Sequence, residues 1–137
     1  MSVIHLTYED FVSKSDQTLD HPLMPFVAGD KTVYVFALSR DLCSGCQIQK
    51  PLYEKLADEM RQKHGDRVRF HSIHLSDQER FTVKREDFRK TLRFAAYPTY
   101  LILIRTDFGA VETYRAIEPP MADIERNILL TLEFVNR

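Results

Sequence analysis

The sequence has little of what metal-binding or multidomain proteins need. Only two cysteines, Cys43 and Cys46, occur in 137 residues, and no second Cys-X-X-Cys pair accompanies them. A structural zinc site takes four ligands and usually draws them from two such pairs, so we expect no bound metal. The sequence also lacks an internal repeat and a low-complexity tract, and we expect a single domain over residues 1–137.

An excess of one charge and a long hydrophobic run are missing as well. The 19 basic and 20 acidic residues give a net charge of −1, which argues against a nucleic-acid partner held mainly by phosphate contacts. No apolar run approaches the ~20 residues that span a bilayer, and residues 1–7 have neither the basic nor the apolar region of a signal peptide. We therefore expect a soluble, cytoplasmic protein with no membrane partner, unless a signal peptide was removed from the chain.

The two cysteines form the motif Cys43-Ser44-Gly45-Cys46, between an apolar β-type run at 32–38 and a long helical pattern. A thiol at the start of a helix has its thiolate stabilised by unpaired N–H groups and by the helix dipole, and the thiolate is the reactive form. Two intervening residues place both sulfurs in the first helical turn, so a disulfide can close with little rearrangement. A pair of small buried hydrophobic residues is the alternative, but the position at a helix start favours redox chemistry.

Other residues that could carry chemistry have simpler interpretations. His71 and His74 could join the cysteines in a metal site, but an alternating strand places them on opposite or skewed faces at this spacing. We expect surface histidines or hydrogen-bonded core histidines. Arg40 and Asp41 precede the motif as loop charges, and they would shift the pKa of a nearby thiol in opposite directions.

Hydrophobic periodicity and turn residues predict an alternation of strands and helices. The nearly continuous apolar run at 31–38 is typical of a strand covered on both faces, so we expect this strand in the middle of the sheet. Residues 16–30 are expected to form an irregular connection or one broken helical turn. The other expected strands are 3–6, 68–75, 99–104 and 110–116, the last two joined by the turn 106–109, and helices are expected over about 8–14, 44–63, 84–95 and from 121 onwards.

Particular residues should set the ends and faces of these helices. Thr7 is expected to cap the first helix, Gly65 to end the second, and Pro51 to kink the second so that its first turn is angled separately. Apolar spacing also predicts the buried faces. The inward residues should be Ile48, Leu52, Leu56 and Met60 in the second helix, Phe88, Leu92 and Ala95 in the third, and Met121, Ile124, Ile128, Leu132 and Val135 in the last.

Together these features resemble the thioredoxin family over nearly the whole chain. The matching features are an opening strand at 3–7, Val35-Phe36 leading to the dithiol, Pro51 five residues after Cys46, Tyr97-Pro98-Thr99 before an aliphatic strand, and a glycine-containing hairpin before the last helix. The resemblance implies an α/β protein with the thioredoxin-like fold, in which helices cover both faces of a central mixed sheet.

The resemblance also implies roles for individual residues. Cys43 would be the attacking thiol, Cys46 the resolving thiol, and Pro98 a cis-proline that faces them. Leu42, Tyr97 and Pro98 would contact the substrate, with the backbone of Tyr97 free to pair with an extended peptide. Because Cys43 precedes the helix and Cys46 lies a turn inside it, we expect Cys43 to be the more exposed and the more acidic thiol.

The sequence departs from the family's familiar pattern at the dithiol. Leu42 stands where those members have tryptophan, and the chain has no tryptophan at all. Ser-Gly replaces Gly-Pro between the cysteines. Ala37 stands where those members bury an acidic residue thought to help move the resolving cysteine's proton. These departures favour a specialised or slower thioredoxin-like protein over a general housekeeping reductase.

We therefore predict an enzyme of thiol–disulfide exchange, in which Cys43 attacks a disulfide of a partner protein and Cys46 resolves the mixed disulfide. Such an enzyme needs no bound cofactor, only an external electron donor such as a reductase, and we expect a monomer. Two alternatives remain: a binding or chaperone module that uses the groove of the fold without turnover, and a redox sensor whose dithiol oxidises without transfer to protein disulfides.

Overall fold

The computed structural model describes residues 2–16, 20–76 and 83–137, with side chains for all of these except 83–85. At its centre lies a five-stranded sheet in the order β1-β3-β2-β4-β5. β1, β3 and β2 are parallel, whereas β4 and β5 run antiparallel to their neighbours, so the sheet is mixed. The strands are β1 (Val3–Thr7), β2 (Val33–Arg40), β3 (Val68–Leu75), β4 (Thr99–Thr106) and β5 (Gly109–Ile117).

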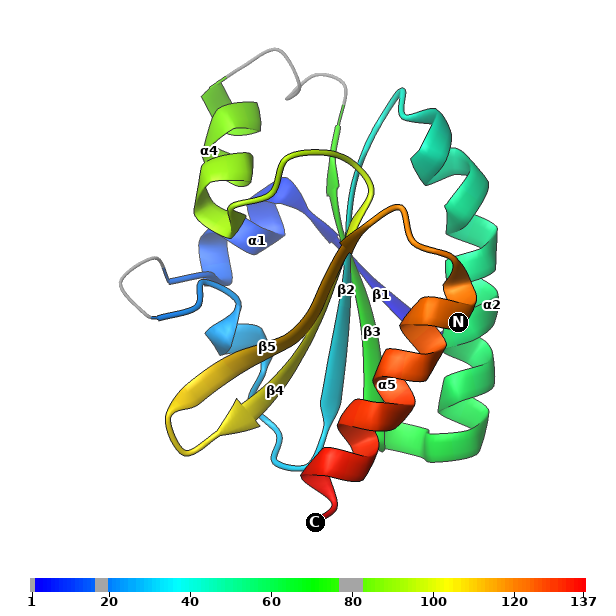
Figure 1. Cartoon of the computed structure of the whole chain (residues 1–137). Coiled ribbons are helices and arrows are strands. Elements are labelled where there is room, and N and C mark those ends of the chain that lie inside the picture. The colour runs from blue at the N-terminus through cyan, green and yellow to red at the C-terminus, as the bar shows by residue number, and fades with distance from the viewer. Residues whose placement is uncertain (1, 17–19, 77–82) are drawn as a thin grey trace.

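Helices cover both faces of this sheet. Figure 1 shows α1 and α4 on one side and α2 and α5 on the other. We call these sides the α1 face and the α2 face. The predicted fold class is therefore confirmed, and no described helix is long and apolar enough to cross a membrane. The helices are α1 (Tyr8–Lys14), α2 (Ser44–His64), α4 (Val83–Leu92) and α5 (Met121–Val135), and short 3-10 turns lie at Met24–Phe26 and Gly65–Arg67.

The ends of the helices follow the local sequence. The Thr7 side chain accepts the backbone N–H of Asp10, and the Asp10 carboxylate accepts the N–H of Thr7, which completes a capping box before α1. Gly65 ends α2 at a φ of 59°, in the region that favours glycine. Both predictions are confirmed. Of the irregular connection predicted at 16–30, residues 17–19 lie outside the described residues, and the remainder contains one 3-10 turn.

Alternate residues of the central strands enter two separate hydrophobic clusters. β2 has β3 on one side and β4 on the other, and most of its residues are buried, as predicted for a central strand. The cluster on the α2 face includes Val33, Val35, Val68, Phe70, Tyr53, Leu56, Met60, Ile124, Ile128 and Leu132. The cluster on the α1 face includes Phe11, Phe26, Tyr34, Phe36, Leu38, Ile73, Leu75, Phe88 and Leu92.

The buried face predicted for α2 is wrong in its first half. Ile48 and Leu52 are 66% and 49% exposed, whereas Tyr53 points into the core. Residues at i, i+4 spacing advance by about 40° per step around a helix with 3.6 residues per turn, so a stripe that faces the core at one end turns away at the other. The buried residues of α2 are Cys46, Gln49, Tyr53, Leu56, Ala57 and Met60.

The predicted end of the helix at 84–95 also needs correction. α4 ends at Leu92, because Arg93 adopts a positive φ of 54°. Ala95 is therefore outside the helix and exposed, and Phe94 is buried instead. The hairpin of β4 and β5 and the inward stripe of α5 agree with the prediction: Ile124, Ile128 and Leu132 are buried, and Met121 and Val135 pack against them.

Candidate active site

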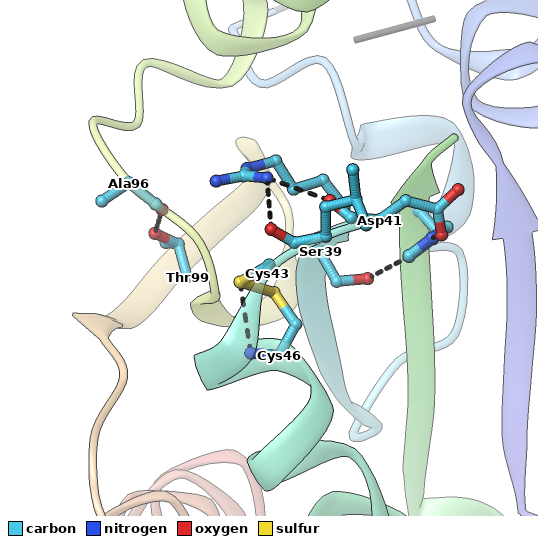
Figure 2. The surroundings of a disulfide bond; sticks show 9 residues. Ser39, Asp41, Cys43, Cys46, Ala96 and Thr99 are labelled. Atoms are coloured by element: carbon cyan, nitrogen blue, oxygen red, sulfur yellow. Dashed lines mark hydrogen bonds and ion pairs between the residues drawn. A yellow bond between two sulfur atoms is a disulfide. The ribbon is translucent and has the colours of Figure 1, made fainter. Parts of the chain in front are cut away.

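The dithiol lies at the point where β2 passes into α2. Cys43 is the N-cap of α2, in an extended conformation, and its sulfur accepts the backbone N–H of Cys46 at 3.2 Å. Cys43 and Cys46 form a disulfide across Cα atoms 5.2 Å apart (Figure 2). A sulfur at this position receives an N–H bond and the positive end of the helix dipole, which stabilise a thiolate once the disulfide is reduced.

The predicted difference in exposure between the two cysteines is wrong for the disulfide form. Cys43 is 6% exposed and Cys46 is 8% exposed, so neither is the more accessible residue. The Cys43 sulfur accepts the Cys46 N–H over the first turn of α2, and both cysteines are buried in this form. The expected difference in acidity stays a prediction.

The loop before Cys43 is held by Arg40. Its guanidinium donates to the carbonyl oxygens of Asp41 and Leu42 at 2.9 and 3.0 Å and lies 5.6 Å from the centre of the Tyr97 ring. Leu42 has a positive φ of 55° and is 64% exposed, so its side chain stands on the surface next to the disulfide. Arg40 therefore joins two of the predicted substrate-contacting residues, Leu42 and Tyr97.

Pro98 lies against the dithiol turn. The Tyr97–Pro98 peptide bond is cis, and Pro98 is buried. A Cβ added at Gly45 would lie 3.3 Å from Cδ of Pro98 and would collide with the Glu118 carboxylate. The backbone N–H of Glu118 in turn donates to the Pro98 carbonyl at 2.9 Å. Gly45 thus lets the turn between the cysteines approach the proline and the segment between β5 and α5.

A pocket of about 280 Å³ opens beside Cys46, between the first turns of α2 and the sheet. Its floor is formed where the α2 face of the strands changes from apolar to polar. Ala37 and Ser39 follow Val33 and Val35 on β2, and they pair with Ser72 and His74 on β3. The remaining walls include Arg40, Asp41, Leu42, Gln47, Lys50, Tyr53, Glu54, His5, Pro98 and Tyr100.

Two histidine–serine pairs, each with a carboxylate near the histidine, line this pocket. In the first, Nδ1 of His74 lies 2.8 Å from Oγ of Ser39, and Nε2 lies 2.7 Å from a carboxylate oxygen of Asp41. Figure 2 shows Ser39 and Asp41 beside the disulfide. In the second, Nδ1 of His5 lies 2.7 Å from Oγ of Ser72, while Nε2 of His5 lies 3.8 Å from the carboxylate of Glu54.

Two buried tyrosines form the inner wall. Burial raises the pKa of Tyr53 well above its usual value, and its hydroxyl donates to the His71 carbonyl at 2.7 Å. Burial also raises the pKa of Tyr100, with the Glu118 charge adding to the effect. Both phenols therefore stay protonated and neutral through the physiological range.

Sequence reasoning did not single out Ser39 or Ser72, and it considered His74 only as a possible metal ligand, an interpretation that it set aside. The signal was present, since polar residues at 39, 72 and 74 interrupt two apolar strands with a period of two. What the pattern could not give is the pairing of β2 with β3, which places Ser39 opposite His74.

His71 belongs to the other face of the sheet. It is buried, and its ring stacks on Phe36 with 4.7 Å between the ring centres. Burial lowers its pKa to about 4, and the charges of Arg69 and Lys14 act in the same direction. His71 and His74 therefore lie on opposite faces, as predicted. Within the described residues, no group of three or more His, Cys, Asp or Glu side chains is placed to hold a metal ion.

Comparison with known proteins shows that the structure of this chain is similar to solved structures. No family model and no curated protein matches the sequence. A chain in the crystal structure of a complex between ferredoxin:thioredoxin reductase and thioredoxin f2 matches with a TM-score of 0.63 at 16% identity, over 95% of this chain and 94% of that one. The chain has the thioredoxin fold.

Two further thioredoxins support this assignment. Thioredoxin f2 from Chlamydomonas reinhardtii matches with a TM-score of 0.61 at 16% identity, over 92% of this chain and 93% of that one. The long form of thioredoxin f from spinach chloroplast matches with a TM-score of 0.58 at 19% identity, over 99% and 88% of the two chains. At these identities the likeness concerns the fold, and the chemistry has to be argued from the site.

Proposed function

We propose that this thioredoxin-fold protein is a thiol–disulfide oxidoreductase that exchanges its Cys43/Cys46 dithiol with disulfides of partner proteins. The observation that carries the proposal is the disulfide at the N-terminus of α2, in which the sulfur of the N-cap Cys43 accepts a backbone N–H at 3.2 Å. The same interaction lowers the free energy of the Cys43 thiolate, which supports Cys43 as the attacking thiol of the proposal.

The reaction proceeds in two exchanges. The Cys43 thiolate attacks one sulfur of the partner's disulfide, forms a mixed disulfide and releases the partner's other sulfur as a thiolate, which takes up a proton from water. Cys46 then loses its proton and attacks Cys43 at the mixed disulfide. The second partner sulfur leaves as a thiolate, the Cys43–Cys46 disulfide forms, and the partner has gained two electrons.

The surface around the disulfide fits an extended polypeptide segment. Leu42 presents an exposed apolar side chain before Cys43, and the cis-peptide Tyr97–Pro98 lies against Gly45 on the other side. An extended segment that carries the target disulfide would pair with the backbone at Tyr97 and contact Leu42 and Pro98 with its side chains. These three residues are the substrate-contacting residues of the proposal.

The oxidised protein has to be reduced again from outside. No residue in the described part of the chain offers a third thiol, since the sequence has two cysteines and both are in the disulfide. We propose that a separate reductase supplies the two electrons. The structure of a similar thioredoxin f2 together with ferredoxin:thioredoxin reductase supports a protein donor as the kind of partner.

Trapping of the mixed disulfide tests the proposal. In Cys46→Ala, Cys43 still attacks but the intramolecular escape is lost, so mixed disulfides with partner proteins should accumulate and survive non-reducing electrophoresis. The wild type should show few such adducts, and the double variant that lacks both thiols controls for non-covalent association. We also expect the wild type to reduce the disulfides of insulin when a strong reductant is supplied. If the variant traps nothing and insulin stays oxidised, the proposal is wrong and a binding module becomes the better interpretation.

A further inference from the structure

If the chain exchanges disulfides as proposed, the Cys46 thiol has to lose its proton before it attacks the mixed disulfide. A free thiol ionises near pH ~8.5, so at neutral pH a nearby base accelerates this step. Cys46 lies in the first turn of α2 and borders the pocket of about 280 Å³. A proton acceptor for Cys46 is therefore expected in the wall of this pocket.

Several ionisable groups of the pocket are unsuited to accept a proton. Tyr53 and Tyr100 stay protonated because burial raises their pKa, and the exposed Lys50 carries an ammonium group with no lone pair to offer. Ala37, which lines the floor of the pocket, has no ionisable group. The remaining candidates are the two imidazoles with their carboxylates.

Hydrogen bonds orient the His74 ring and leave one of its nitrogens able to accept a proton. Its Nε2 lies 2.7 Å from the Asp41 carboxylate, which can only accept, so Nε2 carries the proton. In the neutral imidazole Nδ1 is then the nitrogen with the lone pair, and the Ser39 hydroxyl, 2.8 Å away, donates to it. The lone pairs of the Ser39 oxygen remain available on the pocket side. A proton that arrives at Ser39 can therefore pass to His74, and Asp41 stabilises the imidazolium that results.

We propose that His74 is the proton acceptor for Cys46, reached through pocket water and the Ser39 hydroxyl, with Ser39 and Asp41 as positioning residues. A pocket of about 280 Å³ has room for several waters, each of which occupies ~30 Å³ in the liquid. The balanced step begins with the mixed disulfide at Cys43, the Cys46 thiol and neutral His74. It ends with the Cys43–Cys46 disulfide, the departing thiolate of the partner and protonated His74, which returns its proton to solvent.

His5, the other imidazole of the pocket, is less firmly oriented than His74. Nε2 of His5 lies 3.8 Å from Glu54, too far for a hydrogen bond, so the tautomer of His5 is not fixed by that carboxylate. Asp41, in contrast, is part of the segment that carries Cys43. Its backbone N–H donates to the Leu75 carbonyl at 3.0 Å, which ties that segment to the end of β3 beside His74. The Asp41 side chain that contacts His74 therefore belongs to the same segment as Cys43.

The charges that face His74 come from all the elements around the pocket. Asp41 and Arg40 approach from the end of β2, Lys50 and Glu54 from α2, and His5 from β1. Arg40 directs its guanidinium to the Asp41 and Leu42 carbonyls, and His5 is the group nearest Glu54. Asp41 is the charged group that contacts the His74 ring directly.

The resolving step can be measured without any protein partner. Reduced protein is mixed with Ellman's reagent, an aromatic disulfide. With the reagent in an excess that makes the first attack fast, Cys43 releases the first nitrothiobenzoate, and the displacement of the second by Cys46 is followed as a separate phase. The aromatic thiolate leaves without needing a proton, so the pH dependence of the second phase reports the proton of Cys46. Because no protein substrate takes part, a failure of the proposed partner exchange would not affect this measurement.

We expect His74→Gln to slow the second phase at pH 7 by about tenfold or more, with the first phase unchanged. In the variant the rate should follow thiolate formation and rise until pH ~8.5, so that variant and wild type converge at high pH. A purely structural defect would slow both phases at every pH. Ser39→Ala, which removes only the hydroxyl, should give the same pH profile with a smaller loss.

His5→Gln is the matched control, because it removes the other imidazole of the same pocket. We expect its second phase to keep the wild-type profile at neutral pH. The assignment is overturned if His74→Gln and Ser39→Ala both retain the wild-type rate at pH 7, or if His5→Gln shows the loss instead.

Discussion

The two faces of β2 and β3 differ most where these strands reach the dithiol. On the α1 face, Phe36, Leu38, Ile73 and Leu75 continue the apolar cluster to the ends of the strands, and all four are fully buried. On the α2 face, Val35 gives way to small and polar residues, and the core becomes a pocket beside Cys46. At this end of the strands the α1 face keeps its hydrophobic packing, while the α2 face leaves room for polar groups and water near a reactive thiol.

The largest expected effect comes from placing a carboxylate on each face in turn. Leu38→Asp would bury a charge with no partner, and we expect a loss of about 5 kcal/mol or more, enough to unfold a domain of ordinary stability. Ala37→Asp, one residue away, would place its carboxylate in the polar pocket and should cost at most about 2 kcal/mol. Urea unfolding followed by circular dichroism measures both, and equal losses would contradict the contrast between the faces.

The next effect concerns packing. Phe36 is fully buried between the rings of Phe26 and His71, so Phe36→Ala should lower the free energy of unfolding by about 3–5 kcal/mol. Ser39→Ala on the same strand removes one hydroxyl from the pocket and should change it by no more than about 1 kcal/mol. Chemical denaturation of the two variants under the same conditions decides whether, at the dithiol end of β2, packing stability resides in the α1 face.

The smallest expected effect is a pH dependence carried by His71 on the α1 face. Its pKa is lowered to about 4 in the folded protein, whereas an unfolded histidine titrates near ~6.5. Between these pH values the unfolded chain binds more protons than the folded protein. The contribution of neutral His71 to the free energy of unfolding is therefore fully present above pH ~6.5. It declines as the pH falls, by up to about 3 kcal/mol near pH 4. His71→Leu should remove this dependence. Unfolding free energies at pH 7 and pH 5 for both proteins provide the test, and an unchanged slope in the variant would assign the dependence to other groups.

Much of the fold was accessible from the sequence because its signals are local. The capping pair Thr7 and Asp10, the apolar run of β2 and the 3-4 spacing in α5 each depend on neighbouring residues. The face of α2 was predicted wrongly at Ile48 and Leu52, because an i, i+4 stripe does not say which of its turns meets the sheet.

Some features of the candidate site could also be predicted from local sequence, and others could not. The position of Cys43 and Cys46 at a helix start follows from the order of the residues, and so does the expectation that a disulfide closes between them. The exposure of Cys43 could not be predicted in this way, since both cysteines are buried in the disulfide form. The approach of Glu118 to Gly45 joins segments more than seventy residues apart in the printed sequence.

The sequence by itself determined the elements, their order and the dithiol at the start of α2, since these depend on periodicity, caps and breaks within a few residues. Tertiary structure decided what surrounds the dithiol. Ser39 and Asp41 meet His74 across separations of 35 and 33 residues, and only the parallel pairing of β2 with β3 sets that register. A hydrogen bond needs its partners within about 3 Å, and composition and spacing carry no such distance until the sheet has formed.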